Sequence, residues 1–431
     1  MRVAVFLPVK GQSERIENKN TRLLDGQPLF LLTLSKLINC GLFDEVWLDS
    51  ESETIHALAS EYDCRHHYRD PALASNQTDG NRLFLNEVHQ TQADIVVQVL
   101  CTSPFIRPET LAAGLKVLKS DQSFDSVVLV RRDKCYLWGP EGPLYDFQHI
   151  PNSVDLPETT IETMGLYMVR RQAALELRRR IGNSPFMLPA SPMEAVDLNN
   201  PEDLELAQCL SAGLRERNNR RHRLLQRHLS SALLSDILDD LGHEGIVGGL
   251  RPNLPASRVL GRAKTLHLRA LEPDEDYMGI YDALASYRHL VPGDFIAVQN
   301  DLPDYAYFGE LNANMALEAG AVGAIIGGMT RDSAATSHLG FPVFAAGTGC
   351  ADVRKRATLA SHGRRIVING VEIKDGDLLF ADAEGVVVIP QKLENAVLSR
   401  AVESIGRERA ILTAILSDVD KEHLFSKFGG F

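Results

Sequence analysis

Apolar positions along this chain follow two patterns, one typical of buried strands and one typical of amphipathic helices. The segment 2–7, RVAVFL, is an almost continuous apolar run and predicts a buried first strand. After Ser230 or Ser231, either of which can act as an N-cap, apolar residues recur at helical spacing, and Gly242 ends the pattern. These helical positions are Leu233, Leu234, Ile237, Leu238 and Leu241. Short strands with glycine turns fill most of the remaining chain, and the segment 392–412 predicts a closing helix.

One helix and one strand in the second half predict a shared edge. The segment 310–319 reads as a helix of about 15 Å, capped by Gly320, and 321–327 as a returning buried strand of about 23 Å. The helix start and the strand end therefore lie near each other. We expect the amides of Gly309, Glu310 and Leu311 to face Arg331 and Asp332, as an anion site beside a guanidinium and a carboxylate. A surface ion pair is the alternative for this Arg-Asp pair.

Length and composition restrict the class of protein. A chain of 431 residues predicts two domains, and 44% apolar residues suffice for globular cores. We find no apolar run near the roughly 18 residues of a membrane span, and the first apolar stretch is too short for a secretory signal. Six scattered cysteines without a CxxC pair argue against disulfides and structural zinc, which favours a reducing cytoplasm.

The chain is acidic overall, but one of its segments is strongly basic. A formal net charge of −12 argues against nonspecific nucleic-acid binding over the whole surface. A basic segment nevertheless separates the two halves, with Arg215, Arg217, Arg220, Arg221, Arg223 and Arg227. We interpret 214–229 as a basic helical linker between domains at 1–213 and 230–431, with a solvated face, a subunit contact or a contact with an acidic partner as its role.

The loop after the first strand carries the chemistry of a polyphosphate site. Gly11 allows close backbone approach to an anion, and Ser13 and the main-chain amides can donate hydrogen bonds. Lys10, Arg15 and Lys19 supply positive charge. The loop lacks the spacing of a P-loop and the three-glycine dinucleotide fingerprint, and its residues alone also fit a solvated surface loop.

The first half resembles the cytidylyltransferases that activate 3-deoxy-2-keto sugar acids, the CMP-sialic acid synthetase family. The resemblance rests on ordered blocks that include VKGQSERIENKN, RLLDGQPLF, YRDPALAS, FDSVVLV and VDLNNPEDLELAQ. It implies a doubly wound α/β nucleotidyltransferase domain that binds CTP, with Mg²⁺ or Mn²⁺ at Asp197 and Asn199. The implied nucleotide-binding residues are Lys10, Gly11, Ser13, Arg15, Lys19, Asn20 and Arg69, of which Lys10, Arg15 and Lys19 are also implied in catalysis.

Several positions depart from that family. Glu14 places a negative charge beside the expected triphosphate, and Leu100 stands where a glutamine is usual. The terminal DxD motif reads Asp197-Leu198-Asn199, so one metal-binding carboxylate is replaced by a neutral amide. Three interpretations stay open: an active enzyme with altered metal preference, an enzyme for a different sugar acid, or a nucleotide-binding module without turnover.

The second half resembles the family that joins the regulator of ribonuclease E activity to the 4-hydroxy-4-methyl-2-oxoglutarate aldolases. The resemblance rests on LSDILDDLG, FGELNANMALEAGAVGAIIGGMTRD and DGDLLFADAEGVVVIP. It implies a β/β/α swivelling-type domain, a divalent metal on Asp332, and Arg331 at the keto oxygen as a catalytic and substrate-binding residue. The amides of Gly309, Glu310 and Leu311 are implied to hold the substrate carboxylate.

Together the two resemblances imply a bifunctional enzyme acting on CTP, a sugar acid and a 2-keto acid. One half makes a CMP conjugate, and the other is a magnesium-dependent, pyruvate-type aldolase. The alternative is a nucleotide-binding or catalytically altered first domain fused to a regulatory, protein-binding second domain. Relatives of the two halves imply a homo-oligomer, a trimer or a hexamer.

Overall fold

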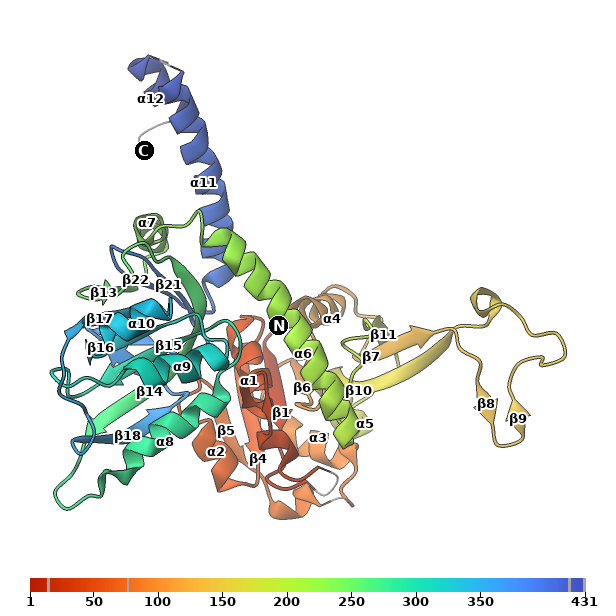
Figure 1. Cartoon of the computed structure of the whole chain (residues 1–431). Helices are drawn as coiled ribbons and strands as arrows, with labels where there is room; N and C mark the ends of the chain where they lie inside the picture. The colour runs from red at the N-terminus through yellow and green to blue at the C-terminus, as the bar shows by residue number, and fades with distance from the viewer. Residues whose placement is uncertain (14–15, 76, 418–419, 429–431) are drawn as a thin grey trace. The chain divides into compact units, whose positions relative to one another are not determined.

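The computed structural model describes residues 1–13, 16–75, 77–417 and 420–428. The chain divides into two compact units, Met1–Ser211 and Ala212–Phe431, and each has its own sheet and hydrophobic cores (Figure 1). Helix α6 (Pro201–Leu225) contains the boundary, so most of the arginine-rich segment is helical. Within the described part of the chain, we find no helix of the length and apolarity that crossing a membrane requires.

The sheet of the first unit is mainly parallel. Its described strands run in the order β11-β7-β10-β6-β1-β4-β5, and only β10 is antiparallel to its neighbours. The strand bounds are β1 (Val3–Pro8), β4 (Glu45–Ser50), β5 (Arg65–Tyr68), β6 (Ile95–Val99), β7 (Ser126–Asp133), β10 (Thr159–Arg170) and β11 (Pro185–Pro189). The helices are α1 (Leu29–Asn39), α2 (Glu53–Leu58), α3 (Gly80–Val88), α4 (Pro108–Ser120) and α5 (Arg171–Leu177).

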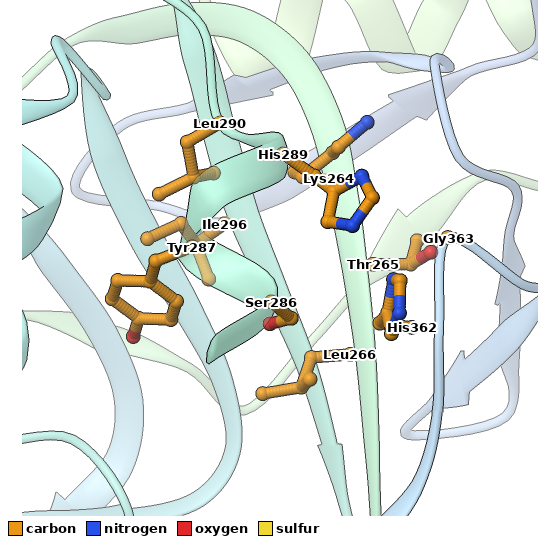
Figure 2. A pocket seen from close by; sticks show the side chains of 10 residues that line it. All are labelled: Lys264, Thr265, Leu266, Ser286, Tyr287, His289, Leu290, Ile296, His362 and Gly363. Carbon is orange, nitrogen blue, oxygen red and sulfur yellow. The ribbon is translucent and has the colours of Figure 1, made fainter. Parts of the chain in front are cut away.

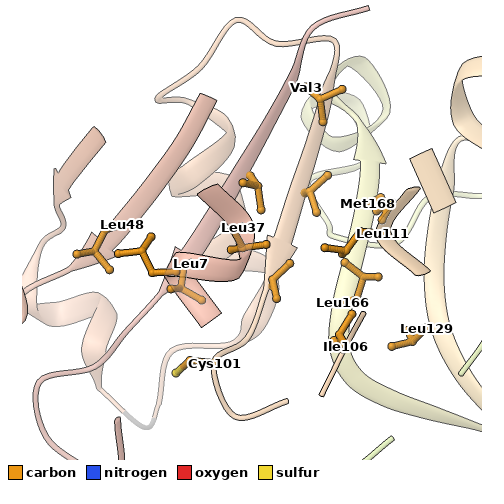
Figure 3. Packing of buried hydrophobic residues seen from close by; sticks show 14 of the residues in the cluster. Val3, Leu7, Leu37, Leu48, Cys101, Ile106, Leu111, Leu129, Leu166 and Met168 are labelled. Carbon is orange, nitrogen blue, oxygen red and sulfur yellow. The ribbon is translucent and has the colours of Figure 1, made fainter. Parts of the chain in front are cut away.

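Strand β1 is buried along its whole length because helices cover both faces of the sheet. Successive side chains of a strand point to opposite faces. Val3 and Leu7 therefore join the core formed with α1 and α4, part of which Figure 3 shows. Ala4 and Phe6 join the core formed with α3 and α5 on the other face. This arrangement confirms the predicted doubly wound α/β fold.

An arm of residues 134–158 leaves the sheet between β7 and β10. It contains the short hairpin β8 (Trp138–Gly139) and β9 (Gly142–Pro143), and it extends away from the body of its unit (Figure 1). Large apolar side chains on it are exposed, among them Trp138, Leu144, Phe147, Ile150 and Val154. A second small hairpin, β2 (Leu23–Leu24) and β3 (Gln27–Pro28), precedes α1.

The second unit is built on a mixed sheet. Its described strands run in the order β12-β22-β21-β14-β15-β16-β17-β13, and β18 also pairs with β14. Strands β14 to β17 are parallel, and the other pairs are antiparallel. The bounds are β12 (Ile246–Val247), β13 (Arg251–Pro252), β14 (Val259–Ala270), β15 (Asp294–Asn300), β16 (Gly323–Thr330), β17 (Val343–Thr348), β18 (Ala357–His362), β21 (Leu378–Ala381) and β22 (Val386–Ile389), with a separate hairpin of β19 (Ile366–Ile368) and β20 (Val371–Ile373).

Helices cover this sheet in separate cores. Helices α8 (Ile280–Ala285) and α9 (Glu310–Glu318) pack in one core with the parallel strands, and α7 (Ser231–Asp240) and α11 (Glu394–Leu416) pack in another with β21 and β22. Helices α10 (Ser333–His338) and α12 (Lys421–Phe428) complete the unit. This architecture agrees with the fold expected for the second half.

The predicted element boundaries were close to those observed. The Ser230 hydroxyl caps α7 by accepting the Leu233 amide at 3.2 Å, and Gly242 follows with a φ of 67°. Helix α9 begins at the predicted residue, and Gly320 has a φ of 82° that favours glycine. The closing helix begins later and ends later than predicted, because a turn occupies the residues after Pro390 and the apolar pattern continues beyond residue 412.

Candidate functional site

The first candidate site lies at the carboxyl end of β1. Strand β1 pairs in parallel with β4 on one side and with β6 on the other. In open α/β sheets, ligands bind at the carboxyl edge where the strand order reverses, and β1 with β6 forms such a point. The loop that begins at Val9 and the loop after β6 meet there. The sheet topology therefore brings the predicted polyphosphate loop to the position where a nucleotide would bind.

Asn20 joins these two loops. Its side-chain amide donates to the carbonyl oxygen of Lys10 at 2.8 Å, and its Oδ1 accepts from the thiol of Cys101, with 3.3 Å between the sulfur and the oxygen. Burial raises the pKa of Cys101 to about 12, so the thiol stays protonated and can donate. Asn20 is itself 7% exposed. The contacts explain how an asparagine in this loop fixes the shape of this edge of the sheet.

Lys19 brings a third, distant segment to the same edge. Its ammonium group donates to the carbonyl oxygen of Leu198 at 2.9 Å, although 179 residues separate the two. The Leu198 amide in turn donates to the carbonyl oxygen of Thr102, at 2.9 Å, in the loop after β6. Asp197 and Asn199, predicted as metal ligands, therefore lie beside the polyphosphate loop.

Asn199 is oriented by its own neighbours. Its side-chain amide donates to Oδ2 of Asp197 at 2.6 Å, and its backbone amide donates to Oδ2 of Asp203 at 2.7 Å. A second aspartate could not make the first of these bonds unless it were protonated. The amide thus neutralises part of the Asp197 charge that a metal ion would otherwise compensate.

The remaining predicted nucleotide residues occupy different surroundings. Lys10, Gly11 and Ser13 lie in the loop, partly exposed, whereas Arg15 falls outside the described residues. Arg69 is 3% exposed and lies beneath the loop, and its side-chain nitrogens donate to Val9, Asp49 and Glu51. Sequence reasoning did not identify Asp49 and Glu51, which become recognisable only through the register of β4 against β1 and β5.

The second candidate site lies where α9 begins beside the end of β16. Phe308 forms a parallel bridge with Thr330, and the amide of Arg331 donates to the Phe308 carbonyl oxygen at 2.9 Å. This pairing brings the start of α9 against Arg331 and Asp332. The amide of Glu310 donates to Oδ2 of Asp332 at 3.2 Å. The structure therefore confirms the predicted proximity of the helix start and the Arg-Asp pair.

Asp332 already occupies part of the expected anion site. Its backbone is left-handed, with a φ of 52°, and its carboxylate lies at the positive end of α9. A Cβ atom added to Gly309 would lie 2.5 Å from Oδ2 of Asp332, so glycine is required for this close approach. The amide of Gly309 donates to Oδ1 of Asn312 at 3.4 Å. Leu311 is 78% exposed at the rim.

Asp352 is a further member of this site that sequence reasoning missed. Its Oδ2 lies 2.5 Å from Nη1 of Arg331, and its Oδ1 accepts the Arg354 amide at 2.7 Å. Nε of Arg331 lies 3.7 Å from Oδ2 of Asp332, and it is buried with no hydrogen-bond partner among the residues that the structure describes. The only available signal was that Asp352 follows β17, the parallel neighbour of β16, so both strands end at one edge. The guanidinium therefore lies between two carboxylates.

A small cavity lies elsewhere in the second unit (Figure 2). Its volume of about 10 Å³ is close to that of one water position. Lys264, His289 and His362 supply its polar lining, and burial together with Lys264 lowers the pKa of His362. Tyr287 forms part of the wall, and its hydroxyl accepts from the side-chain amide of Asn312 at 3.3 Å. The cavity wall thus supports the residue that caps α9.

The donor sets suit a metal ion only with help from a ligand. No group of three or more His, Cys, Asp or Glu side chains suited to hold a metal occurs in the described ranges. Asp197 with Asn199 offers one carboxylate and one amide oxygen, and Asp332 offers one carboxylate. Mg²⁺ commonly takes its other oxygens from waters and substrate phosphates. Both donor sets fit that kind of partial coordination.

Comparisons with known proteins match the two units separately. A cytidylyltransferase family model matches residues 4–185, and an aldolase/RraA family model described as RraA-like matches residues 231–388. A relative from Halalkalibacterium halodurans, named "Putative 4-hydroxy-4-methyl-2-oxoglutarate aldolase", is 30% identical over 44% of this chain and 89% of its own length. Pseudaminic acid cytidylyltransferase from Campylobacter jejuni serotype O:2 is 25% identical over 49% of this chain and 96% of its own length.

A further relative is much longer than the matched region. Protein DlpA from Legionella pneumophila is 31% identical over 44% of this chain, but the match spans only 30% of that protein. The similarity to DlpA is therefore confined to a minor part of its length.

Proposed function

Because the chain belongs to the cytidylyltransferase family through its first unit and to the aldolase/RraA family through its second, we propose that it is a bifunctional enzyme of sugar-acid metabolism. The first unit would transfer a cytidylyl group from CTP to a 3-deoxy-2-keto sugar acid. The second would cleave or form a 2-keto acid by aldol chemistry. Such sugar acids are pyruvate aldol products in chemical terms, so the two activities share a substrate class.

In the first reaction, the anomeric hydroxyl oxygen of the sugar acid attacks the α-phosphorus of CTP. The hydroxyl proton is lost, and pyrophosphate leaves. The transition state carries negative charge on phosphate oxygens, so positioning and charge neutralisation carry most of the catalysis. The proposal gives Lys10 and Lys19 that role, together with Arg15. Asp197 and Asn199 would hold Mg²⁺ or Mn²⁺, which would neutralise phosphate charge when bound.

One observation carries this proposal. The Lys19 ammonium contacts Leu198, between the two candidate metal ligands, and Asn20 contacts the loop after β6. Cations, an amide and a carboxylate therefore converge at the switch point of the sheet. Pyrophosphate release from CTP with a panel of 3-deoxy-2-keto sugar acids and Mg²⁺ or Mn²⁺ tests the proposal. Absence of CTP binding by calorimetry would reject it, together with the simpler role of nucleotide module.

For the second unit we propose a metal-dependent, pyruvate-type lyase. Retro-aldol cleavage leaves an enolate of pyruvate, and a bound cation would supply charge that stabilises it. Arg331 would contact the keto oxygen, Asp332 would hold Mg²⁺, and the start of α9 would hold the substrate carboxylate. The closeness of Asp332 to the Glu310 amide supports this assignment. The groups proposed to contact the keto oxygen, to hold the metal and to bind the carboxylate lie together in one small site.

Pyruvate release from 4-hydroxy-2-keto acids, with and without Mg²⁺, tests the lyase. We expect release only with the metal, and a loss of about 100-fold or more in Asp332→Ala. Asp239→Ala, at an exposed position on α7, is the matched control and should retain activity. If the wild type releases no pyruvate, the alternative of a regulatory, protein-binding second domain becomes the better interpretation.

We also propose that the protein is a homo-oligomer, a trimer or a hexamer. The exposed apolar side chains on the arm of the first unit support self-association, because contiguous apolar surface is usually covered by a partner. Light scattering after gel filtration would measure the mass directly. A monomer at micromolar concentration would reject the proposal.

A further inference from the structure

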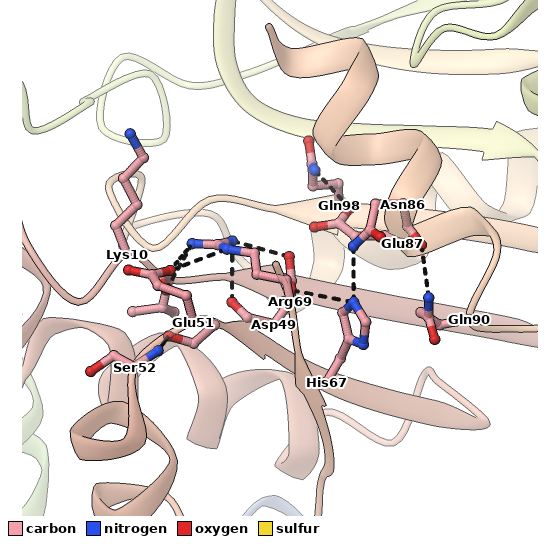
Figure 4. Close-up of polar contacts among 12 residues, drawn as sticks. Lys10, Asp49, Glu51, Ser52, His67, Arg69, Asn86, Glu87, Gln90 and Gln98 are labelled. Carbon is pink, nitrogen blue, oxygen red and sulfur yellow. Dashed lines mark hydrogen bonds and ion pairs between the residues drawn. The ribbon is translucent and has the colours of Figure 1, made fainter. Parts of the chain in front are cut away.

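The start of the nucleotide loop is tied to the ends of β4 and β5 by two side chains (Figure 4). Oε1 of Glu51 accepts the amide of Gly11 at 2.7 Å. Oε2 of the same carboxylate accepts from Nη2 of Arg69 at 2.7 Å and from Nε at 3.2 Å. Nη2 of Arg69 also donates to the carbonyl oxygen of Val9 at 3.1 Å. The backbone of the loop is therefore held at two points, Val9 and Gly11, by one ion pair.

The ion pair is itself fixed by the sheet. Nη1 of Arg69 donates to Oδ2 of Asp49 at 3.1 Å, and the Asp49 side chain is fully buried. The amide of Val9 donates to the carbonyl oxygen of Asp49 at 2.8 Å. The guanidinium of Arg69 therefore donates to acceptors on three residues, Val9, Asp49 and Glu51, and its planar fork of donors suits this better than a single ammonium would. The geometry leaves little freedom for the loop backbone.

Within this tie, the carboxylate of Glu51 is paired with the guanidinium of Arg69. Burial opposes ionisation of Glu51, but the Gly11 amide and Arg69 hold the pKa of Glu51 below its usual range. The carboxylate is therefore ionised at neutral pH and is paired with the guanidinium. An unpaired carboxylate at this place would repel a triphosphate, because like charges repel each other even in water. Arg69 thus allows an acidic residue to lie under an anion-binding loop.

The close approach of the loop to β4 also explains the glycine. A Cβ atom added to Gly11 would lie 2.6 Å from Cβ of Ser52 and 3.3 Å from Oε1 of Glu51. Because the amide of Gly11 donates to Glu51, it is already engaged and is not offered to a phosphate. The contacts to phosphate then fall to the side chains of the loop. In Figure 4 the side chain of Lys10 extends away from the ion pair.

We propose that Glu51 and Arg69 are positioning residues of the cytidylyltransferase site. Glu51 holds the Gly11 amide, and Arg69 holds the Val9 carbonyl and neutralises Glu51, so that the loop presents its cationic side chains to the triphosphate of CTP. This role rests on the proposed binding of CTP at the loop. It gives Arg69 a function through the loop backbone rather than through contact with the nucleotide base.

Charge-conserving variants separate positioning from electrostatics. Glu51→Asp keeps the charge but is one methylene too short to reach both Gly11 and Arg69. Arg69→Lys keeps the charge but loses the fork. We expect each variant to raise the KM and the calorimetric Kd for CTP by about tenfold, with kcat changed by less than about threefold, because a displaced loop weakens binding before it changes the chemical step. Arg65→Lys, at the start of β5 and paired with Glu45 rather than with the loop, should retain both values.

The double variant Glu51→Asp with Arg69→Lys provides a second readout. Because both residues act on the same stretch of backbone, the two effects on Kd should be less than multiplicative. Thermal unfolding identifies any variant that does not fold. If Arg69→Lys fails to fold, the Glu51→Asp variant alone tests the positioning role, because it leaves the pair of Arg69 with Asp49 intact.

The failures of this inference and of the proposed function are distinguishable. If the wild type does not bind CTP, the proposed function fails. If the wild type binds CTP and a folded Glu51→Asp variant binds it equally well, the positioning role is wrong while the CTP site stands.

Discussion

The two candidate sites of this chain differ in how their charges are held. In the first unit, Arg69 and Asp49 are buried, and Lys19 reaches a partner 179 residues away. In the second, Arg331 and Asp332 are adjacent in sequence and have side chains that are 38% and 46% exposed. Buried side chains of its own unit therefore hold the first site in place. The second site lies at the surface, and its charged side chains form ion pairs with one another.

This difference has a consequence for ligand binding. The loop of the first site is held before any nucleotide arrives, so CTP would meet a preorganised backbone. At the second site Asp332 lies where a substrate carboxylate is proposed to bind, and Arg331 contacts Asp352. A keto acid would have to replace those internal contacts. We therefore expect substitutions in the first unit to affect binding through distant contacts, and substitutions in the second to act locally.

The largest expected effect is at Lys19. Lys19→Met removes a cation from the nucleotide edge and releases the segment that contains Asp197 and Asn199. We expect kcat/KM for cytidylyl transfer to fall by about 100-fold to 1000-fold, in the range found when a single charge-stabilising group is removed. Steady-state pyrophosphate release measures it, and Lys116→Met, at an exposed position on α4, is the control. If a folded Lys19→Met variant turns over at the wild-type rate, this loop has no role in the reaction.

How far the sequence predicted these sites depends on how local their contacts are. Helix α9 was predicted to within one residue because its periodicity and the glycine after it are local signals, whereas β16 begins two residues and ends three residues later than predicted. The pairing of their ends followed from element lengths alone. In the first unit the meeting of the loop with Asp197 came only from the family resemblance, because no local pattern links positions so far apart.

The missed residues share one physical cause. Glu51, Asp49 and Asp352 follow or end strands, and their partners lie on neighbouring strands or loops. Which residues face each other depends on strand order and register, and a shift of one residue would point each side chain to the other face. A single sequence contains no direct signal for register. Charged residues at strand ends therefore remained unassigned until the sheets were known.

The next largest effect should come from Asp352. Asp352→Asn removes the negative charge that holds Nη1 of Arg331, but keeps the size of the side chain. We expect kcat/KM of the proposed lyase to fall by about tenfold, since a strong charge-assisted hydrogen bond is replaced by a neutral one. Pyruvate release measures the change, and cytidylyl transfer in the same sample should be unchanged. Equal losses in both activities would instead indicate a general loss of folding.

Asn199→Asp tests the metal preference of the first site. This variant places a second carboxylate beside Asp197 and removes the hydrogen bond that Asn199 donates to Asp197 at 2.6 Å. We expect the Kd for Mg²⁺ to fall by about threefold to tenfold, because an anionic ligand replaces a neutral one, and the variant without metal to melt at a lower temperature. Calorimetry with Mg²⁺ and thermal unfolding in chelator measure the two effects. Unchanged Mg²⁺ affinity would argue that this pair does not hold the metal.

The smallest expected effect lies behind the first site, at a buried carboxyl group (Figure 4). Glu87 is fully buried, accepts from Nε2 of Gln98 at 2.7 Å, and has its pKa raised well above the usual range by burial and then by Asp49. A group whose pKa is raised on folding stabilises the folded state least at high pH. Its contribution is fully present below the pKa of the unfolded chain, near 4.3, and is lost as the pH rises through the folded value.

Glu87→Gln should therefore stabilise the first unit at pH 8, where the unfolded wild type is ionised at this position and burial opposes ionisation in the folded state. A neutral amide can still accept from Gln98 and can donate towards Asp49. We expect the melting temperature of this unit to rise by about 2–4 °C at pH 8 and the difference from wild type to shrink as the pH approaches 4. Calorimetric melting across that range measures it. A difference that is constant with pH would show that Glu87 is ionised in the folded protein, and that the buried network under the nucleotide loop carries one more negative charge than we infer.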